Sequence, residues 1–236
     1  MNEIIKILAK VEGGTVLDAA TGKGEFIATL KQNLKSYVQI IGVDSSARSV
    51  EFAEKLFPEN DVEIFRMNLE DLQFEDSYFD TVCISNSLHH LEHLDVVINE
   101  LLRVLKPGGF MLITEMYSDG QQTPAQQSHI LMHHWIAGVD RLSGMYHQST
   151  YTKAELEQIA KKLLLKKTAI HDFYIPVDNP NKNCETLLKN CRDTLKKLET
   201  MPDSQLLIDE GNNLLKRLSE VGCASASRLI IAGYKN

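Results

Sequence analysis

Basic residues are scarce in this sequence. Its 25 lysines and arginines stand against 32 aspartates and glutamates, which gives a formal net charge of −7. Proteins that bind nucleic-acid phosphates concentrate lysine and arginine on one face, so this balance argues against a nucleic-acid partner. The sequence also lacks a long apolar run and a recognisable signal peptide. We therefore expect a cytoplasmic protein without a membrane span.

Cysteine is scarce as well. The four cysteines, Cys83, Cys184, Cys191 and Cys223, show neither CxxC pairing nor the spacing of a zinc finger. Cysteines of cytoplasmic proteins are ordinarily reduced. We expect four free thiols, with Cys184 and Cys191 as core residues on one apolar helix face.

Short apolar runs fill the first half of the chain, each bounded by Gly, Asp, Asn or Pro, and they predict buried strands. They cover residues 15–19, 39–43, 62–67, 79–85 and 109–115. Helical patterns alternate with them, the clearest over 94–105, which is expected to end at Lys106-Pro107-Gly108-Gly109. This alternation predicts an α/β fold with a doubly wound parallel sheet, whose ligands bind outside the carboxyl ends of the strands.

The second half is less regular. It predicts a helix over 124–139, a helix that opens with a capping box of Thr152 and Glu155, and strands over 166–173 and 227–234. We expect one domain over 1–236, with a lid-like helical insertion at about 120–148 and a helical hairpin at about 181–222. The hairpin could cover the substrate or form the surface of a homodimer, and the pattern does not decide between them.

A carboxylate ends the first predicted strand, and small residues follow it. Asp18 and Ala19 close the strand, and Ala20, Gly22 and Gly24 occupy the turn. Small residues let a backbone approach a nucleotide closely. A carboxylate here would repel a pyrophosphate but suits a ligand with sulfonium and ammonium groups. The run predicts a pocket for S-adenosylmethionine (SAM), whose product is S-adenosylhomocysteine.

A second carboxylate, Asp44, ends the second predicted strand, where it could accept hydrogen bonds from both hydroxyls of a ribose. Ser45 follows it. Alternatively, Asp44 or Ser45 only caps the helix over 47–57. Dinucleotide sites place such an acid about 20 residues after the glycine turn, and Asp44 has this spacing, which favours the ribose role.

Two later strand ends would complete the pocket. After the third strand, Asn68 and the backbone of Leu69 could hold an adenine edge, although an ordinary Asx-turn would use the same residues. After the fourth strand, the loop from Ser85 to His90 would border the reactive end of the cofactor.

These four segments, in this order, resemble class I SAM-dependent methyltransferases over about residues 1–115. The small-molecule branch typified by ubiquinone and menaquinone biosynthesis methyltransferases has a similar loop and turn, which here read Leu88-His89-His90 and Leu105-Lys106-Pro107-Gly108-Gly109. The resemblance implies a Rossmann-like, seven-stranded sheet, mostly parallel with a reversed last strand. It also implies a small-molecule methyl acceptor.

The resemblance assigns roles to the residues of the pocket. Asp18 and the small residues of the turn would hold the methionine part, Asp44 would bind the ribose, and Asn68 with Leu69 would hold the adenine. Two residues depart from the family pattern. Ala20 replaces a glycine, which keeps the approach open if its φ angle is negative, and Asn68 replaces an acid but can still accept a hydrogen bond.

Other nucleotide sites fit the turn less well. The segment Thr21-Gly22-Lys23-Gly24 lacks the earlier glycine and the following Ser or Thr of a P-loop. A nicotinamide site would need a glycine where Asp18 stands. The fourth-strand loop also lacks the Asn-Pro-Pro-Tyr sequence used by many methyltransferases that act on amines of DNA bases or glutamine.

Methyl transfer from SAM requires mainly that the acceptor is aligned and water excluded. A base is needed only where the acceptor must lose a proton, and histidine is the usual one. His89 and His133 are the catalytic candidates, and Tyr117, His129 and Trp135 are the candidate substrate contacts.

His129, His133 and Asp140 share one face of a predicted helix. This face could bind a metal, contact the substrate or form a lid, or simply pack against its surroundings. Because Gly138 can interrupt the helix and the neighbours are apolar, we expect no metal. We expect a SAM-dependent methyltransferase for a small, uncharged or cationic metabolite. The alternatives are a non-catalytic SAM sensor and a subunit that depends on a partner protein.

Overall fold

A computed structural model of the protein describes residues 3–58, 60–174 and 184–236. Its chain divides into two compact units. The first comprises residues up to Glu115 together with 157–173 and 229–236, and the second comprises 116–156 and 174–228. The first three residues of the expected hairpin, 181–183, lie outside the described ranges. The single-domain assignment stays a prediction.

In the part of the chain that the structure describes, seven strands form the sheet of the first unit, in the order β3-β2-β1-β4-β5-β7-β6. Their bounds are Thr15–Ala19 (β1), Gln39–Asp44 (β2), Val62–Arg66 (β3), Phe79–Ser85 (β4), Leu105–Met116 (β5), Lys166–Phe173 (β6) and Arg228–Tyr234 (β7). β1 to β5 pair in parallel. β7 is antiparallel to β5, since Lys235 exchanges backbone hydrogen bonds with Gly108 and Gly109. The predicted fold class, with its reversed last strand, is confirmed.

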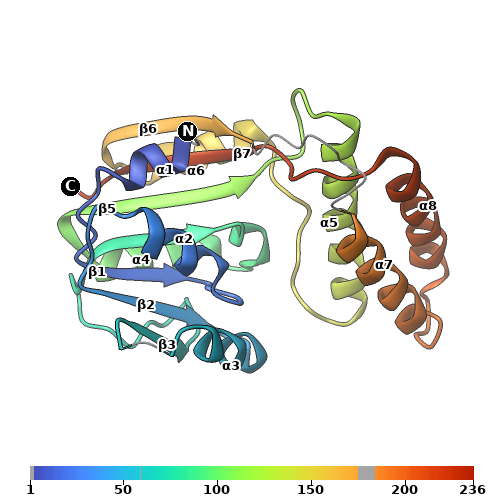
Figure 1. Ribbon diagram of the computed structural model, residues 1–236, viewed down its shortest axis with the longest axis horizontal. Helices are drawn as coiled ribbons and strands as arrows, with labels where there is room; N and C mark the ends of the chain where they lie inside the picture. The colour runs from blue at the N-terminus through green and yellow to red at the C-terminus, as the bar shows by residue number, and fades with distance from the viewer. Residues whose placement is uncertain (1–2, 59, 175–183) are drawn as a thin grey trace. The chain divides into compact units, whose positions relative to one another are not determined.

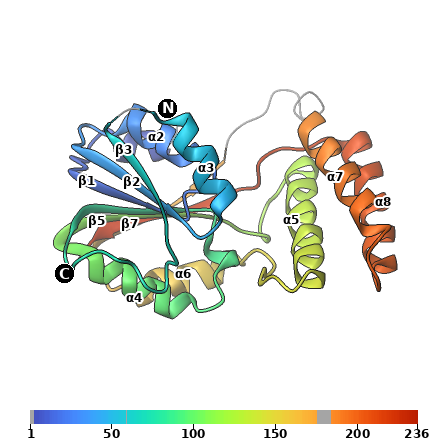
Figure 2. The same cartoon turned by 90° about the horizontal axis from the view of Figure 1, so that it is seen from below.

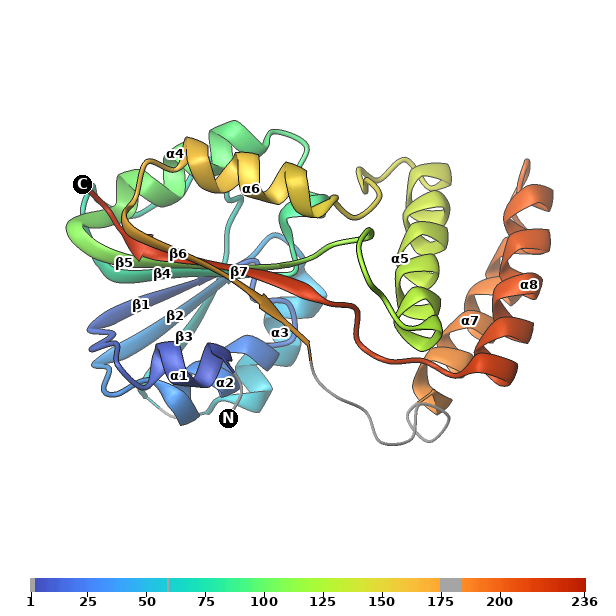
Figure 3. The same ribbon diagram turned by 90° about the horizontal axis from the view of Figure 1, so that it is seen from above.

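Helices cover both faces of this sheet. They are Glu3–Leu8 (α1), Glu25–Asn33 (α2), Ala47–Leu56 (α3), Leu94–Val104 (α4) and Lys153–Lys162 (α6), with a short 3₁₀ turn at Leu88–His90. Figure 3 shows α4 and α6 on one face of the sheet and α1, α2 and α3 on the other. Apolar strand residues such as Val16, Ile40 and Leu112 are fully buried between the layers, so the sheet forms the core that positions its loops.

The boundary between α4 and β5 differs from the prediction. The helix ends at Val104 and β5 begins at Leu105, earlier than the expected Gly109. The pairing with β4 jumps from Phe79–Leu105 to Thr81–Phe110, so the predicted Pro-Gly turn forms an irregularity inside the strand. Gly108 has a φ of +73°, a conformation that glycine tolerates, and this lets the strand bend without ending.

The second unit is a cluster of three helices within the described residues: Pro124–Leu142 (α5), Glu185–Leu198 (α7) and Gln205–Val221 (α8). They lie side by side in Figure 2 and bury a common set of apolar side chains, among them Met132, Trp135, Leu195 and Leu214. α5 begins with a capping box between Thr123 and Gln126. The predicted helix from residue 124 and the helical hairpin are both present. No helix in the described ranges has the length and hydropathy needed to cross a bilayer.

Cys184 and Cys223 form a disulfide, with their Cα atoms 5.7 Å apart. The expectation of four free thiols is therefore wrong for this pair. Cys184 immediately precedes α7, and Cys223 follows the residue that caps α8, so folding of the hairpin brings the two together. The periodicity of a single helix carries no sign of this contact. Cys83 and Cys191 are free and buried, as expected.

Candidate cofactor site at the carboxyl edge of the sheet

The predicted pocket residues of β1, β2 and β4 lie at one edge of the sheet. Because these three strands are adjacent and parallel, their carboxyl ends meet. Figure 1 shows the arrowheads of β1 and β2 pointing the same way. Asp18 is in register with Gly42 on one side and Cys83 on the other. The loops after β1, β2 and β4 therefore emerge side by side.

The turn after β1 has an unusual backbone. Ala20, Gly22 and Gly24 have φ angles of +54°, +54° and +84°. A Cβ atom added at Gly24 would lie 2.5 Å from Phe57, whereas one added at Gly22 would meet nothing within 4 Å. Glycine is thus required at Gly24 for packing as well as for conformation, while the space beside Gly22 is open.

Ala20 corrects the prediction. Its φ is positive, so the condition on which the alanine was expected to be harmless is not met. In the left-handed region the Cβ crowds the following carbonyl oxygen, at a cost of roughly 1–2 kcal/mol per residue. The turn holds Ala20 in this conformation partly through the next residue, Thr21, whose backbone amide donates to the carbonyl of Val43 at 2.9 Å.

Asp18 is buried, with 1% of its surface exposed. Its Oδ2 accepts a hydrogen bond of 2.6 Å from the hydroxyl of Thr21. The pKa of Asp18 is raised to about 7: burial is the main cause, the bond from Thr21 opposes the shift, and the nearby charge of Asp44 adds to it. A cation beside this carboxyl group would favour its ionised form, which is the property expected of a site for a sulfonium and an ammonium group.

Asp44 joins the end of β2 to the turn after β1. Its Oδ2 accepts from the backbone amide of Gly22 at 2.9 Å, and its Oδ1 accepts from the amide of Ser46 at 2.8 Å. The side chain that caps α3 belongs to Ser46, which accepts from the amide of Ser49. The cap of α3 is therefore Ser46, and not Asp44 or Ser45 as the alternative interpretation had it. The sequence pattern did not identify Ser46.

Asn68 forms the Asx-turn that the sequence left open. Its Oδ1 accepts from the backbone amide of Glu70 at 3.1 Å. The side chain of Leu69 is buried, and that of Asn68 is exposed. The side chain of Asn68 therefore has a structural role in this turn, and the contact of Asn68 with adenine stays a prediction.

The loop after β4 is held by a residue that the sequence reasoning missed. Glu115 is fully buried at the end of β5. Its Oε2 accepts from the backbone amide of Leu88 at 2.7 Å, and its Oε1 lies 3.1 Å from Nδ1 of His89, which is also fully buried. Ser85, the predicted cofactor contact, has its hydroxyl 2.9 Å from that of Thr114. Glu115 ends an apolar run, as Asp18 and Asp44 do, so the signal was present.

The candidate histidines of the second unit, His129 and His133, lie together. The rings of His129 and His133 have centroids 4.7 Å apart. Nδ1 of His129 accepts a hydrogen bond from the backbone amide of Ala226 at 3.2 Å. Burial, with a smaller effect of the Arg228 charge, lowers the pKa of His129 to about 4. This ring is therefore neutral at pH 7 and is engaged in the structure of its own unit.

The other residues predicted to contact substrate or metal also have internal contacts. Trp135 is 4% exposed, and its Nε1 donates to the carbonyl of Leu207 at 2.7 Å. Asp140 pairs with Nδ1 of His147 at 2.7 Å. Tyr117 is buried, and its backbone amide donates to the carbonyl of Ser227. These contacts explain the residues structurally, and their roles toward a substrate stay predictions.

Residues 17–113 match a protein family described as a methyltransferase domain. The matched segment contains β2 to β4 and most of β1 and β5, and with them the turn after β1, Asp44 and the loop after β4. Among curated relatives, the 2-phytyl-1,4-naphtoquinone methyltransferase of Trichormus variabilis is 30% identical over 122 residues, which are 50% of this chain and 53% of the relative.

The ubiquinone/menaquinone biosynthesis C-methyltransferase UbiE of Pseudomonas putida is 33% identical over 107 residues, which are 44% of this chain and 42% of the relative. The chain thus spans about half the length of the curated relatives that it matches.

Solved structures share the fold along nearly the whole chain. The YcgJ protein of Bacillus subtilis is 20% identical, with a TM-score of 0.61 over 99% of this chain and 97% of its own. Phosphoethanolamine N-methyltransferase 2 of Haemonchus contortus, solved in complex with S-adenosyl-L-methionine, is 19% identical, with a TM-score of 0.58 over 99% of this chain and 51% of its own. At these identities the likeness concerns the fold.

Proposed function

We propose that this chain, whose residues 17–113 match a methyltransferase domain, is a class I methyltransferase that transfers a methyl group from SAM to a small-molecule acceptor. The observation that carries the proposal is the bond between the Gly22 amide and Asp44, which joins the two motif segments at one sheet edge. The names of the relatives, which specify quinone-type small molecules, support a small-molecule acceptor.

The residues at this edge fit the proposed cofactor. In the described part of the chain, the buried carboxyl group of Asp18 forms no ion pair, and a cationic ligand would compensate for its burial. We assign the methionine part to Asp18, Ala19 and the turn of Ala20, Gly22 and Gly24. We assign the ribose to Asp44 and Ser45, and the adenine to Asn68 and Leu69. Ser85 would lie at the edge of the reactive centre.

SAM, when bound, supplies a methyl group on a sulfonium that already carries a good leaving group. The protein's contribution is to align the acceptor and exclude water, and positioning of this kind can supply roughly 7–11 kcal/mol of a barrier. Glu115 fixes the ring of His89 through Nδ1, so we assign His89, within the loop after β4, a positioning or proton-accepting role. His133 is the second candidate base. We further propose a lid or homodimer role for the hairpin, and a cytoplasmic location in which the Cys184–Cys223 disulfide is an exception to the reduced state of most cytoplasmic cysteines.

The cofactor assignment is tested by calorimetric titration of SAM into the Asp44→Ala variant. Loss of a charge-assisted hydrogen bond should weaken binding by about 1.5–3 kcal/mol, or about 10-fold to 150-fold. Glu63→Ala, on the exposed face of β3, is the matched control and should bind as the wild type does. Equal affinities for all three proteins would refute the ribose assignment.

The acceptor is sought with SAM labelled in its methyl group and a metabolite extract, followed by identification of the labelled product. A labelled small molecule supports the proposal, and label in protein or RNA contradicts it. Tight SAM binding without transfer to any extract component would favour the sensor alternative. With the acceptor in hand, His133→Ala should reduce turnover far more than SAM affinity; an equal loss of both would show a structural role.

A further inference from the structure

A cavity of about 610 Å³ lies in the second unit, between α5 and α8. This α5–α8 groove is distinct from the proposed SAM site, all of whose residues belong to the first unit. The two helices are antiparallel: Arg217, late in α8, donates to the carbonyl of Pro124 at the start of α5, whereas Gly138, late in α5, lies against Leu207, early in α8. The volume of the α5–α8 groove is within the range of small-molecule sites, roughly 300–1,000 Å³.

The floor of the groove is apolar and fixed. The ring of Trp135 is held by the hydrogen bond from Nε1 to the carbonyl of Leu207. A Cβ atom at Gly211 would lie 2.4 Å from the same ring, so the glycine makes room for the tryptophan between α5 and α8. Leu214 is buried beside it. A ligand would therefore meet a preformed surface, which lowers the entropy cost of binding.

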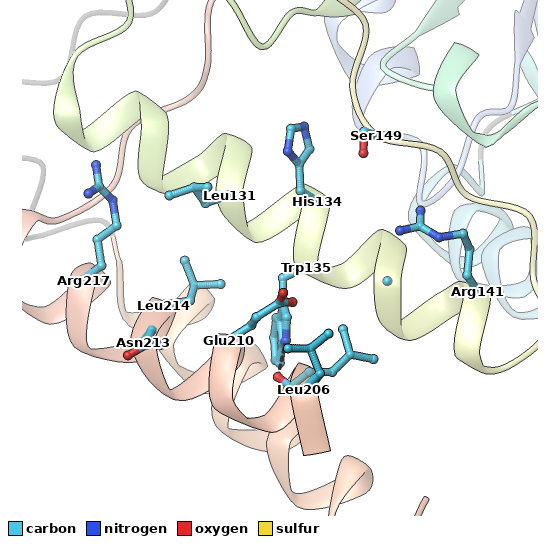
Figure 4. Close-up of a pocket in the computed structure, with 12 residues that line it drawn as sticks. Leu131, His134, Trp135, Arg141, Ser149, Leu206, Glu210, Asn213, Leu214 and Arg217 are labelled. Atoms are coloured by element: carbon cyan, nitrogen blue, oxygen red, sulfur yellow. Dashed lines mark hydrogen bonds between the residues drawn. The ribbon is translucent and has the colours of Figure 1, made fainter. Parts of the chain in front are cut away.

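Leucines on both walls of the groove are exposed. Leu131 on α5 and Leu206 on α8 line the cavity and leave 45% and 70% of their surfaces in contact with water. Figure 4 shows Leu131 beside Leu214 and Leu206 beside Trp135. An apolar ligand in the groove would cover both leucines, and burial of apolar surface would favour its binding.

Two arginines mark the ends of the groove. Arg141 and Arg217 lie at opposite ends in Figure 4, and the hydrogen bonds described for the two guanidinium groups go to neutral oxygen atoms. Arg217 already donates to Ser128, Pro124 and Gln127. The guanidinium of Arg141 makes one described hydrogen bond, at 2.6 Å to the carbonyl of His147, which fixes its direction. Of its five N–H donors, most remain for a ligand.

Glu210 restricts where an anion can bind. It lines the groove on α8, between the two arginines in sequence and in Figure 4. Its charge would repel a negative group in the middle of the groove, so an anionic group belongs at an end. Leu131 and Arg141 are ten positions apart, which corresponds to about 15 Å along the helix. This is close to the extended length of a medium-length aliphatic chain.

We propose that the α5–α8 groove binds an elongated amphipathic monocarboxylate, with its apolar chain on Trp135 and the leucines and its carboxylate on Arg141. Guanidinium and carboxylate form paired, charge-assisted hydrogen bonds, which fix the orientation of such a ligand. The site is independent of SAM binding and does not rest on the proposed function.

Dodecanoate, kept below its micelle concentration, is the probe. Trp135 is the chain's single tryptophan, so its fluorescence reports on the groove directly. We expect dodecanoate to cause a saturable change in the fluorescence of the wild type. Arg141→Gln should weaken the affinity for dodecanoate at least about tenfold, because it removes one charge-assisted hydrogen bond. Arg192→Gln, an exposed arginine on α7 that does not line the groove, is the matched control and should leave the affinity unchanged.

Comparison ligands decide the chemistry. Dodecanol and dodecyltrimethylammonium should bind much more weakly than dodecanoate; equal binding of either would overturn the carboxylate site. A fluorescence titration that shows no response to dodecanoate would overturn it too. So would a dimer in sedimentation that Leu206→Asp converts to monomer, because a second copy of the chain would then occupy the groove. Calorimetry with SAM on the same variants keeps this result separate from that of the proposed function.

Discussion

The carboxyl edge of the sheet and the helical cluster of the second unit use their polar residues in different ways. At the sheet edge, Asp18 and Asp44 come from separate strands and converge on one short turn. In the helical cluster, Trp135 and His129 are bound to backbone groups of their own unit. We therefore expect the strand ends of this chain, rather than its amphipathic helices, to hold the cofactor.

Replacement of Trp135 by alanine should give the largest effect on stability and would sharpen this contrast between the two regions. Removal of a buried tryptophan costs about 3–5 kcal/mol, so we expect urea unfolding of the second unit at much lower concentration. Tyr146→Ala, at an exposed tyrosine of the same unit, should change stability by less than about 0.5 kcal/mol. SAM affinity that falls in parallel with stability would break the contrast, because the first unit would then depend on this side chain.

Reduction of the Cys184–Cys223 disulfide should have the next largest effect, again on the second unit. The bond closes a loop with a sequence separation of 39, and loss of such a cross-link costs about 2–4 kcal/mol. Thermal unfolding with and without a dithiol reductant measures this. A Cys184→Ser, Cys223→Ser double variant should show no further response to the reductant. If the wild type shows none either, or if four thiols titrate in the unreduced protein, the disulfide is absent.

The pH dependence of SAM binding tests the carboxyl edge of the sheet. The pKa of Asp18 is raised to about 7, so the free protein holds a proton there below that pH. A cationic ligand favours the carboxylate, so binding releases the proton, and affinity should fall by about tenfold per unit as the pH drops below about 7. Above pH 7 the carboxyl group of Asp18 is ionised, and its titration should no longer change the affinity. Calorimetry at several pH values measures the slope, and Asp18→Asn should abolish it; the same slope in that variant would assign the titration elsewhere.

Substitution of Ala20 by glycine should have the smallest effect. Glycine relieves the positive φ but loses more backbone entropy on folding, so we expect a net stabilisation of about 0.5–1 kcal/mol. Ala53→Gly, inside α3, should destabilise by a similar amount and is the matched control. Equal destabilisation by both changes would show that Ala20 bears no strain.

The sequence predicted the sheet because each strand is a local apolar run bounded by turn residues. It predicted Asp18 and Asp44 as partners of one site because parallel strands bring their ends together whatever the loops do. Glu115 had the same signal, a carboxylate after an apolar run, and was overlooked. The positive φ of Ala20 could not be predicted, because alanine rarely adopts it and only the surrounding turn imposes it.

The second unit was less predictable for a physical reason. Helical periodicity shows which residues share a face, but it does not show what that face packs against. The bond from Trp135 to Leu207 and the Cys184–Cys223 disulfide join residues far apart in sequence. Each depends on how three helices are arranged, and no local pattern determines that arrangement.

Hydrogen–deuterium exchange with and without SAM tests the central claim most directly, because it reports on both regions in one experiment. We predict that SAM slows exchange in peptides covering residues 18–24, 44–46 and 85–90, at the carboxyl edge of the sheet, while peptides from α7 and α8 exchange at unchanged rates. Protection confined to the helices of the second unit, with the sheet edge unaffected, would contradict the account.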